Sequence, residues 1–94
     1  MSTGTHERKN SFTAGQNALS TTPEVIFAAK ADRLFCEVKN LDASITVYIG
    51  PTDSVSSSNG HALKAGESFA FENVIGAIYA VAASGTPTVS TFEW

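Results

Sequence analysis

One cysteine and one of the two histidines are the side chains of this 94-residue chain that could form a nucleophilic pair. A cysteine nucleophile needs a histidine within hydrogen-bond reach and an acidic group that orients the histidine. Cys36 stands in the middle of an apolar run, whereas His61 stands beside a glycine turn, so the spacing gives no reason to expect the two side chains to meet. The sequence therefore predicts a buried cysteine without a disulfide, and no enzyme activity.

The side chains that could bind a metal ion are few and scattered. His6 and Glu7, together with His61, could hold an ion between subunits, but separated histidines of this kind are usually solvated. Asp53 begins a serine-rich loop that could surround calcium, yet a hard cation requires several carboxylates and this loop has one. We expect neither a metal site nor a cofactor.

The composition excludes some classes of partner. The formal net charge is -3 and charged residues make up 16% of the chain, so it lacks the basic face of a nucleic-acid-binding protein. The longest apolar stretches, such as residues 74–83, are too short to span a bilayer, and the N-terminus has no hydrophobic secretion signal. We expect a soluble protein made in the cytoplasm, without a nucleic-acid or membrane partner, whose weakly charged surface suits contact with another protein.

The chain is organised around two turns in residues 59–68. Asn59-Gly60 is a dipeptide that accepts positive φ at both central positions of a turn, and Gly66 offers the same freedom a few residues later. The sequence therefore predicts structural turns at Asn59, Gly60 and Gly66, which join β-strands.

Alternating apolar and polar residues predict short strands along the whole chain, with no helical period. The expected strands cover residues 17–21, 25–29, 33–40, 44–50, 68–72, 75–83 and 88–94, with a brief apolar contact near Leu63. In residues 33–40 the pattern places Cys36 and Val38 toward the core, and Arg33 and Phe35 on the wetter face. These seven or eight strands predict an all-β fold, a small antiparallel β-sandwich that is jelly-roll-like, or a small barrel.

Four aromatic side chains are candidates for contact with another subunit or partner. Phe35 and Tyr48 are expected on the outward faces of their strands, Tyr79 lies in a strand that is apolar on both faces, and the chain ends on Trp94. The polar loop of residues 50–58 is long for a hairpin, so we expect it to carry specificity.

The first fifteen residues differ from the rest. They are mostly Ser, Thr, Gly and charged residues, which cannot build a core. We expect residues 1–15 to form a flexible arm that folds on a partner through Arg8, Lys9 and Phe12, and residues 16–94 to form the β-sandwich domain.

Five short segments carry a resemblance to a known group of proteins. They are Val38-Lys39-Asn40-Leu41, Val47-Tyr48-Ile49-Gly50, Asn59-Gly60, Leu63-Lys64-Ala65-Gly66-Glu67-Ser68 and Ile78-Tyr79-Ala80-Val81-Ala82-Ala83-Ser84-Gly85-Thr86. Their succession, over residues 34–92, resembles small β-sandwich virion proteins of tailed bacteriophages: head decoration (cement) proteins and related modules of head fibres and tails.

The resemblance implies a structural protein on the capsid surface of a virion. A head decoration protein of this kind would be a homotrimer that binds the major capsid protein and stabilises neighbouring capsid subunits, with the N-terminal arm as the capsid-binding segment. The alternative is a tail or fibre module that binds a host surface glycan, with Tyr48, Tyr79 or Trp94 as a stacking platform.

Overall fold

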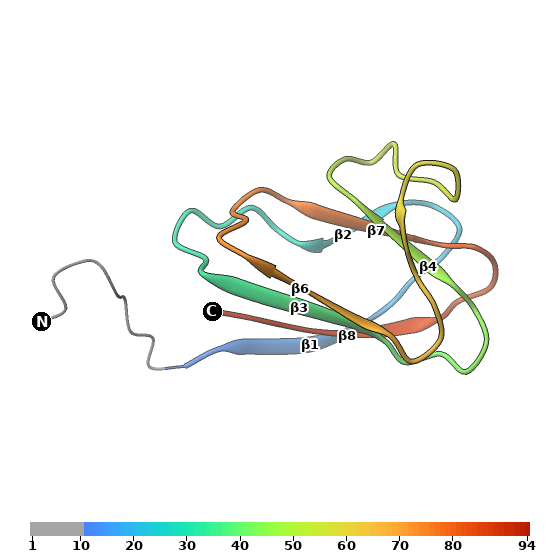
Figure 1. Ribbon diagram of the computed structural model, residues 1–94, viewed down its shortest axis with the longest axis horizontal. Helices are drawn as coiled ribbons and strands as arrows, with labels where there is room; N and C mark the ends of the chain where they lie inside the picture. The colour runs from blue at the N-terminus through green and yellow to red at the C-terminus, as the bar shows by residue number, and fades with distance from the viewer. Residues whose placement is uncertain (1–10) are drawn as a thin grey trace, which may run out of the picture.

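The computed structural model describes residues 11–94, which form two antiparallel sheets of four strands each (Figure 1). The strands are β1 (Thr13–Ala18), β2 (Glu24–Phe27), β3 (Phe35–Asn40), β4 (Val47–Gly50), β5 (His61–Leu63), β6 (Ser68–Glu72), β7 (Ile78–Ala82) and β8 (Thr88–Glu93). The predicted all-β sandwich is confirmed. Within residues 11–94 there is no helix that could cross a membrane.

The order of the strands is that of a jelly roll. Sheet A has the order β1-β8-β3-β6 and sheet B the order β2-β7-β4-β5. The first strand pairs with the last, and the pairs β2 with β7, β3 with β6 and β4 with β5 are nested inside it. This nesting describes one long hairpin rolled into two sheets, the jelly-roll arrangement.

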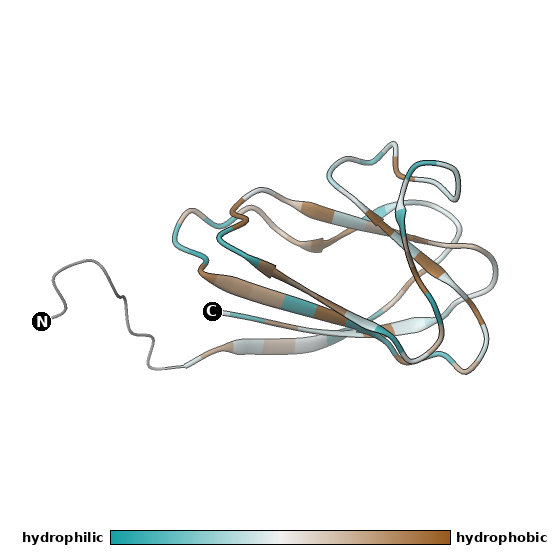
Figure 2. Ribbon diagram, in the orientation of Figure 1, coloured by the Kyte–Doolittle hydropathy of each residue, from teal (hydrophilic) through white to brown (hydrophobic). Residues whose placement is uncertain are grey.

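The core lies between the two sheets and follows the predicted alternation. Cys36 and Val38 of β3 are fully buried, and Val47 and Ile49 of β4 face them from sheet B. Figure 2 shows hydrophobic segments of β3 interrupted by hydrophilic ones, because the intervening residues turn to the other face. The central strand β7 contributes small side chains to the core, which lets the sheets approach closely.

The prediction that Arg33 lies on the wetter face of its strand is wrong. It is 2% exposed, and its guanidinium donates hydrogen bonds to the carbonyl oxygens of Ala28 (2.9 Å), Val74 (2.9 Å) and Gly76 (2.6 Å). It also forms an ion pair with the Glu93 carboxylate at 3.0 Å. Because β3 begins only at residue 35, strand alternation does not govern residue 33. Arg33 instead links the β2–β3 loop, the β6–β7 loop and the end of β8 through these bonds.

The boundary of the predicted arm is also corrected. Residues 13–15 belong to β1 and pair with β8, with Thr13 opposite Glu93 and Gly15 opposite Thr91. The ring of Phe12 contacts the ring of Phe92 on the same chain, with 5.9 Å between centroids. β1 is a polar strand at a sheet edge, where pairing depends on backbone hydrogen bonds, so its sequence shows no alternation of apolar and polar residues. Arg8 and Lys9, the other predicted arm contacts, lie outside the described residues.

The structure has a turn at each of the two predicted places, but the backbone differs between them. Gly66 has a φ of 79°, whereas neither Asn59 nor Gly60 has a positive φ, although Gly60 N donates a hydrogen bond of 2.8 Å to Ser56 O across its turn. Gly60 is required for another reason: a Cβ atom there would lie 2.8 Å from the Cβ of Tyr48 and 2.9 Å from the carbonyl oxygen of Ser56. The absence of a side chain, and not a left-handed turn, explains this glycine.

Candidate functional site

The outer face of sheet A gathers aromatic side chains from three parts of the chain. Phe35 and Trp94 lie opposite each other and exchange both backbone hydrogen bonds, Phe35 N to Trp94 O at 3.1 Å and Trp94 N to Phe35 O at 3.0 Å. Phe92, two residues before Trp94, turns to the same face. The register of β1 with β8 places Phe12 just beyond the start of β1, beside them.

These four residues form an aromatic cluster: Phe12, Phe35, Phe92 and Trp94. The Phe35 and Trp94 rings are stacked, with 4.7 Å between centroids and 22° between planes. Phe92 meets Phe35 edge to face at 5.7 Å and Trp94 at 5.6 Å, and Phe12 adds its contact with Phe92. Such geometries stabilise ring pairs beyond simple burial. Phe12 remains 60% exposed and the other three rings are half-buried, so the cluster stays open to a partner.

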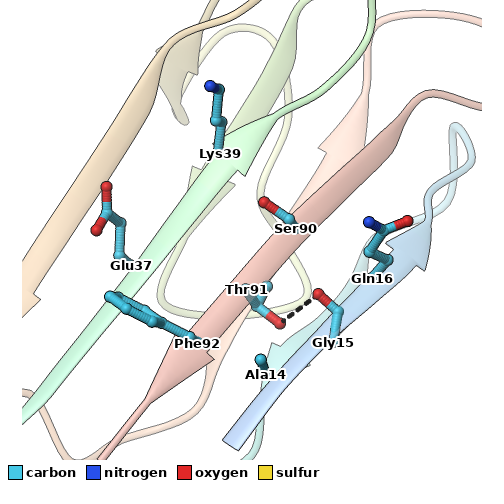
Figure 3. A pocket seen from close by; sticks show the side chains of 8 residues that line it. All are labelled: Ala14, Gly15, Gln16, Glu37, Lys39, Ser90, Thr91 and Phe92. Atoms are coloured by element: carbon cyan, nitrogen blue, oxygen red, sulfur yellow. Dashed lines mark hydrogen bonds between the residues drawn. The ribbon is translucent and has the colours of Figure 1, made fainter.

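A shallow depression of about 540 Å³ borders the aromatic cluster (Figure 3). We call it the outer depression, and its lining residues are Ala14, Gly15, Gln16, Glu37, Lys39, Ser90, Thr91 and Phe92. The register explains the gathering, because Phe92 pairs with Ala14 on one side and Glu37 on the other, while Ser90 pairs with Gln16 and Lys39.

The outer depression carries polar side chains that are free to bind a ligand. Glu37 and Lys39 are two residues apart on β3, so both point to the outer face, where Figure 3 shows Glu37 beside Phe92 and Lys39 farther along the strand, which pairs there with Ser90. Within residues 11–94, no hydrogen bond or ion pair occupies the side chains of Glu37, Lys39, Gln16 or Ser90. The Thr91 hydroxyl donates a long hydrogen bond of 3.5 Å to the Gly15 carbonyl oxygen. A carboxylate, an ammonium, an amide and a hydroxyl thus line one depression together with an aromatic ring.

The four predicted contact residues are divided between opposite faces of the sandwich. Phe35 and Trp94 lie in the aromatic cluster, whereas Tyr48 and Tyr79 are half-buried on the outer face of sheet B, where Tyr79 pairs with Val25 and Gly50. The tyrosines therefore cannot share one binding platform with Trp94.

The polar segment of residues 50–58, which was expected to carry specificity, lies almost entirely in the β4–β5 loop of residues 51–60, and this loop packs against its own sheet. Val55 is only 5% exposed, and a Cβ atom at Gly50 or Gly60 would come within 2.8 Å of its side chain. Asn59 fixes the loop, since its side chain accepts a hydrogen bond from Ser56 N (2.8 Å) and donates one to Ser54 O (3.1 Å). The loop covers part of sheet B, which leaves sheet A as the more open face.

Cys36 and His61 have separate surroundings. Cys36 is completely buried in the core, and burial raises the pKa of its thiol, although nearby Arg33 acts in the opposite direction. The ring of His61 lies 4.7 Å from the ring of Phe69, at the edge of the sandwich. In the part of the chain that is described, no three metal-ligating side chains come together.

Phe92 and the polar residues around it were not predicted as a site. The signal was present in part, because alternation assigned Phe35 to the outer face of its strand and Phe92 has the parity of Trp94. What the sequence lacks is the pairing of β8 with β1 and β3, which brings these faces together.

No family model matches this chain, and no curated protein matches it in sequence. Among solved structures, the stem and receptor-binding domain of the spike protein P1 from bacteriophage PM2 aligns with a TM-score of 0.64 and 15% identity. The alignment covers 85% of this chain and 32% of the spike chain, so this chain spans about a third of that length. The Bacillus endospore appendages that form disulfide-linked pili align with a TM-score of 0.60 and 12% identity, over 89% of this chain and 84% of theirs. At these identities the likeness shows a shared fold.

Proposed function

We propose that this protein is a structural component of a bacteriophage particle and that it binds a glycan on the host surface through the outer face of sheet A. One observation carries the proposal. Unpaired polar side chains and a half-buried aromatic ring line one open depression of about 540 Å³, beside three more aromatic rings.

The chemistry of this surface matches that of a sugar. A pyranose has an apolar face of C–H groups, which packs on an aromatic ring, and a rim of hydroxyl groups, which need donors and acceptors. Phe92 offers the ring, Glu37 accepts hydrogen bonds, and Gln16 and Ser90 both donate and accept. Lys39 adds a cation that suits an acidic sugar. No bond of the ligand needs to be broken, so the protein acts by contact and not as an enzyme.

The solved structures with this fold support a role at the surface of a particle. One neighbour is named as the stem and receptor-binding domain of a phage spike, and the other as an appendage that forms pili. Both names describe structures at the surface of a particle or spore, and the phage spike agrees with the resemblance to virion proteins seen in the sequence.

Binding to host cells tests the proposal. Labelled protein should bind host cells and their isolated surface glycans, and Glu37→Gln should weaken glycan binding by about 10-fold to 100-fold, as expected for loss of a hydrogen bond to a charged group. Tyr79→Phe, on the opposite face, is the matched control and should bind normally. Equal binding by the Glu37 and Tyr79 variants would remove the outer depression from the mechanism.

Head decoration is the second candidate, and one observation favours it. Phe12 is 60% exposed at the start of the described residues, where an added apolar contact with a capsid subunit would bury it. In this case the protein would sediment with capsids of its phage and ignore host cells, and Phe12→Ser would reduce the bound amount. The two candidates therefore give opposite results when the same labelled protein is mixed with capsids and with cells.

A further inference from the structure

The sandwich is open along one edge, where β6 ends sheet A and β5 ends sheet B. An apolar cleft of about 320 Å³ lies there between the sheets, and we call it the edge cleft; Phe69, Phe71, His61, Ile49 and Ile78 are among its lining residues. Phe69 is 38% exposed although it faces the cleft, and Val74 and Ile75, just beyond β6, are 38% and 51% exposed. This edge therefore exposes a contiguous apolar surface.

Edge strands usually carry features that prevent pairing with another chain, such as short length, a bulge, proline or lysine. β2 follows Pro23 and contains a register shift between Val25 and Phe27. β5 has only 3 residues. β1 has no such feature, but it carries no large apolar side chain. β6, with 5 residues, has neither a bulge nor proline nor lysine, and it bears Phe69 and Phe71.

The free backbone groups of β6 can be assigned from its bonds to β3. Asn40 N donates to Glu67 O at 2.9 Å, and Asn73 N donates to Leu34 O at 2.9 Å, at the two ends of the β3–β6 pairing. In an antiparallel ladder, alternate residues bond to the same neighbour. Phe69 and Phe71 therefore bond to β3, while the N–H and C=O groups of Ser68, Ala70 and Glu72 point to the open edge.

We propose that β6 pairs with β6 of a second copy of this chain, antiparallel, about a two-fold axis at Ala70. In this register Ala70 lies opposite the partner's Ala70, and Ser68 lies opposite the partner's Glu72. All the free N–H and C=O groups of these residues are then bonded across the axis.

The side chains of β6 fit this register. No like charges face each other, because each Glu72 meets a serine, and the small Ala70 side chains meet at the centre. Phe69 lies opposite the partner's Phe71 and Phe71 opposite the partner's Phe69, so the ring pair already present in each chain, with 4.9 Å between centroids, becomes a two-by-two group of four rings. This group of rings closes the mouths of both edge clefts, which covers the apolar surface that is exposed in one copy.

Introducing a charged side chain at position 70 tests the proposal. Ala70 is exposed on the outer face, opposite Glu37 of β3, so a longer side chain has room there, and circular dichroism checks that the added charge leaves the fold of one copy intact. Wild type should sediment as a dimer in a concentration-dependent manner, whereas Ala70→Lys and Ala70→Glu should each sediment as a monomer, because like charges then face each other across the axis. An equimolar mixture of the two variants should restore the dimer.

Ala18→Lys and Ala18→Glu, on the opposite edge strand β1, are the matched controls and should keep the wild-type mass. Far-ultraviolet circular dichroism should show the same fold in every variant. A monomeric wild type, or an oligomer whose mass does not change in Ala70→Lys, would overturn the inference. The experiment uses no ligand, so its result does not depend on the proposed glycan function.

Discussion

Arg33 is the residue on which one end of the sandwich depends. Its guanidinium is held between the β2–β3 loop, the β6–β7 loop and Glu93, and it also lies 5.6 Å from the centre of the Phe27 ring. An ammonium group cannot make the same set of planar hydrogen bonds, so lysine is a poor substitute at this position.

We predict that Arg33→Met destabilises the fold by about 3–5 kcal/mol, because it leaves the Glu93 carboxylate and several carbonyl groups without a partner. Arg33→Lys should recover only part of this loss. Urea denaturation measures the free energy of unfolding, and Lys64→Met, at an exposed lysine, provides the control. Equal stability of Arg33→Met and the control would contradict the role assigned to Arg33.

Gly66 allows a second residue-scale prediction. Its φ of 79° is unfavourable for any residue with a Cβ, although nothing lies within 4 Å of the place where that Cβ would be. Gly66→Ala should therefore cost about 1 kcal/mol through backbone strain alone, and lower the melting temperature by about 4–8 °C. Gly76→Ala also meets no atom within 4 Å and has no positive φ, so it should be neutral. The same melting temperature for both variants would refute the conformational argument.

At the scale of elements, the loop of residues 51–60 acts as a cover for sheet B. Gly60 lies at the point of closest approach, between Tyr48, Val55 and the backbone of Ser56. Its role there depends on size, whereas the role of Gly66 depends on φ.

Gly60→Asn separates these two roles. Asparagine tolerates a left-handed backbone but adds volume, so we predict that Gly60→Asn destabilises the protein by about 1–3 kcal/mol through overpacking. Gly66→Asn should cost much less than Gly60→Asn, and thermal unfolding of both variants checks the order. The reverse order would mean that backbone conformation, and not size, requires a glycine at position 60.

The elements that the sequence predicted well are those with a clear apolar pattern. β3, β4 and β6 lie within the expected strands because their apolar residues alternate, and β7 lies within one because its apolar run is bounded by turn residues. β1 begins at Thr13, before the expected strand of residues 17–21. It is exposed along most of its length, so its residues show no apolar alternation from which the pairing with β8 could be predicted. The candidate site escaped prediction for the same reason: Phe12, Phe35 and Phe92 meet only through strand pairing between distant parts of the chain.

At the scale of the whole molecule, the start of β1 decides what can be removed from the N-terminus. Deleting residues 2–10 should leave the sandwich intact, since the pairing of β1 with β8 begins at Thr13. Deleting residues 2–15 removes half of β1 and the Phe12 ring contact, so the melting temperature should fall clearly. Calorimetry on the two proteins compares them, and equal melting temperatures would show that residues 11–15 are not part of the body.

Pairing through β6 would also affect binding by the whole assembly. The two-fold axis of an antiparallel edge pair runs perpendicular to the sheet, so both copies present the outer face of sheet A on the same side. Two glycan sites on one side of a dimer bind a cell surface more tightly than one site, because the second binding event is intramolecular.

The most direct test of the central claim is a titration of isotope-labelled protein with purified host surface glycans, followed by the backbone amide signals in nuclear magnetic resonance spectra. We predict that the signals of Gln16, Glu37, Lys39, Ser90 and Phe92 shift, while those of Tyr48, Tyr79 and the loop of residues 51–60 stay in place. Shifts confined to sheet B or to that loop, or no shifts at all, would contradict the assignment of the outer face of sheet A as the binding surface.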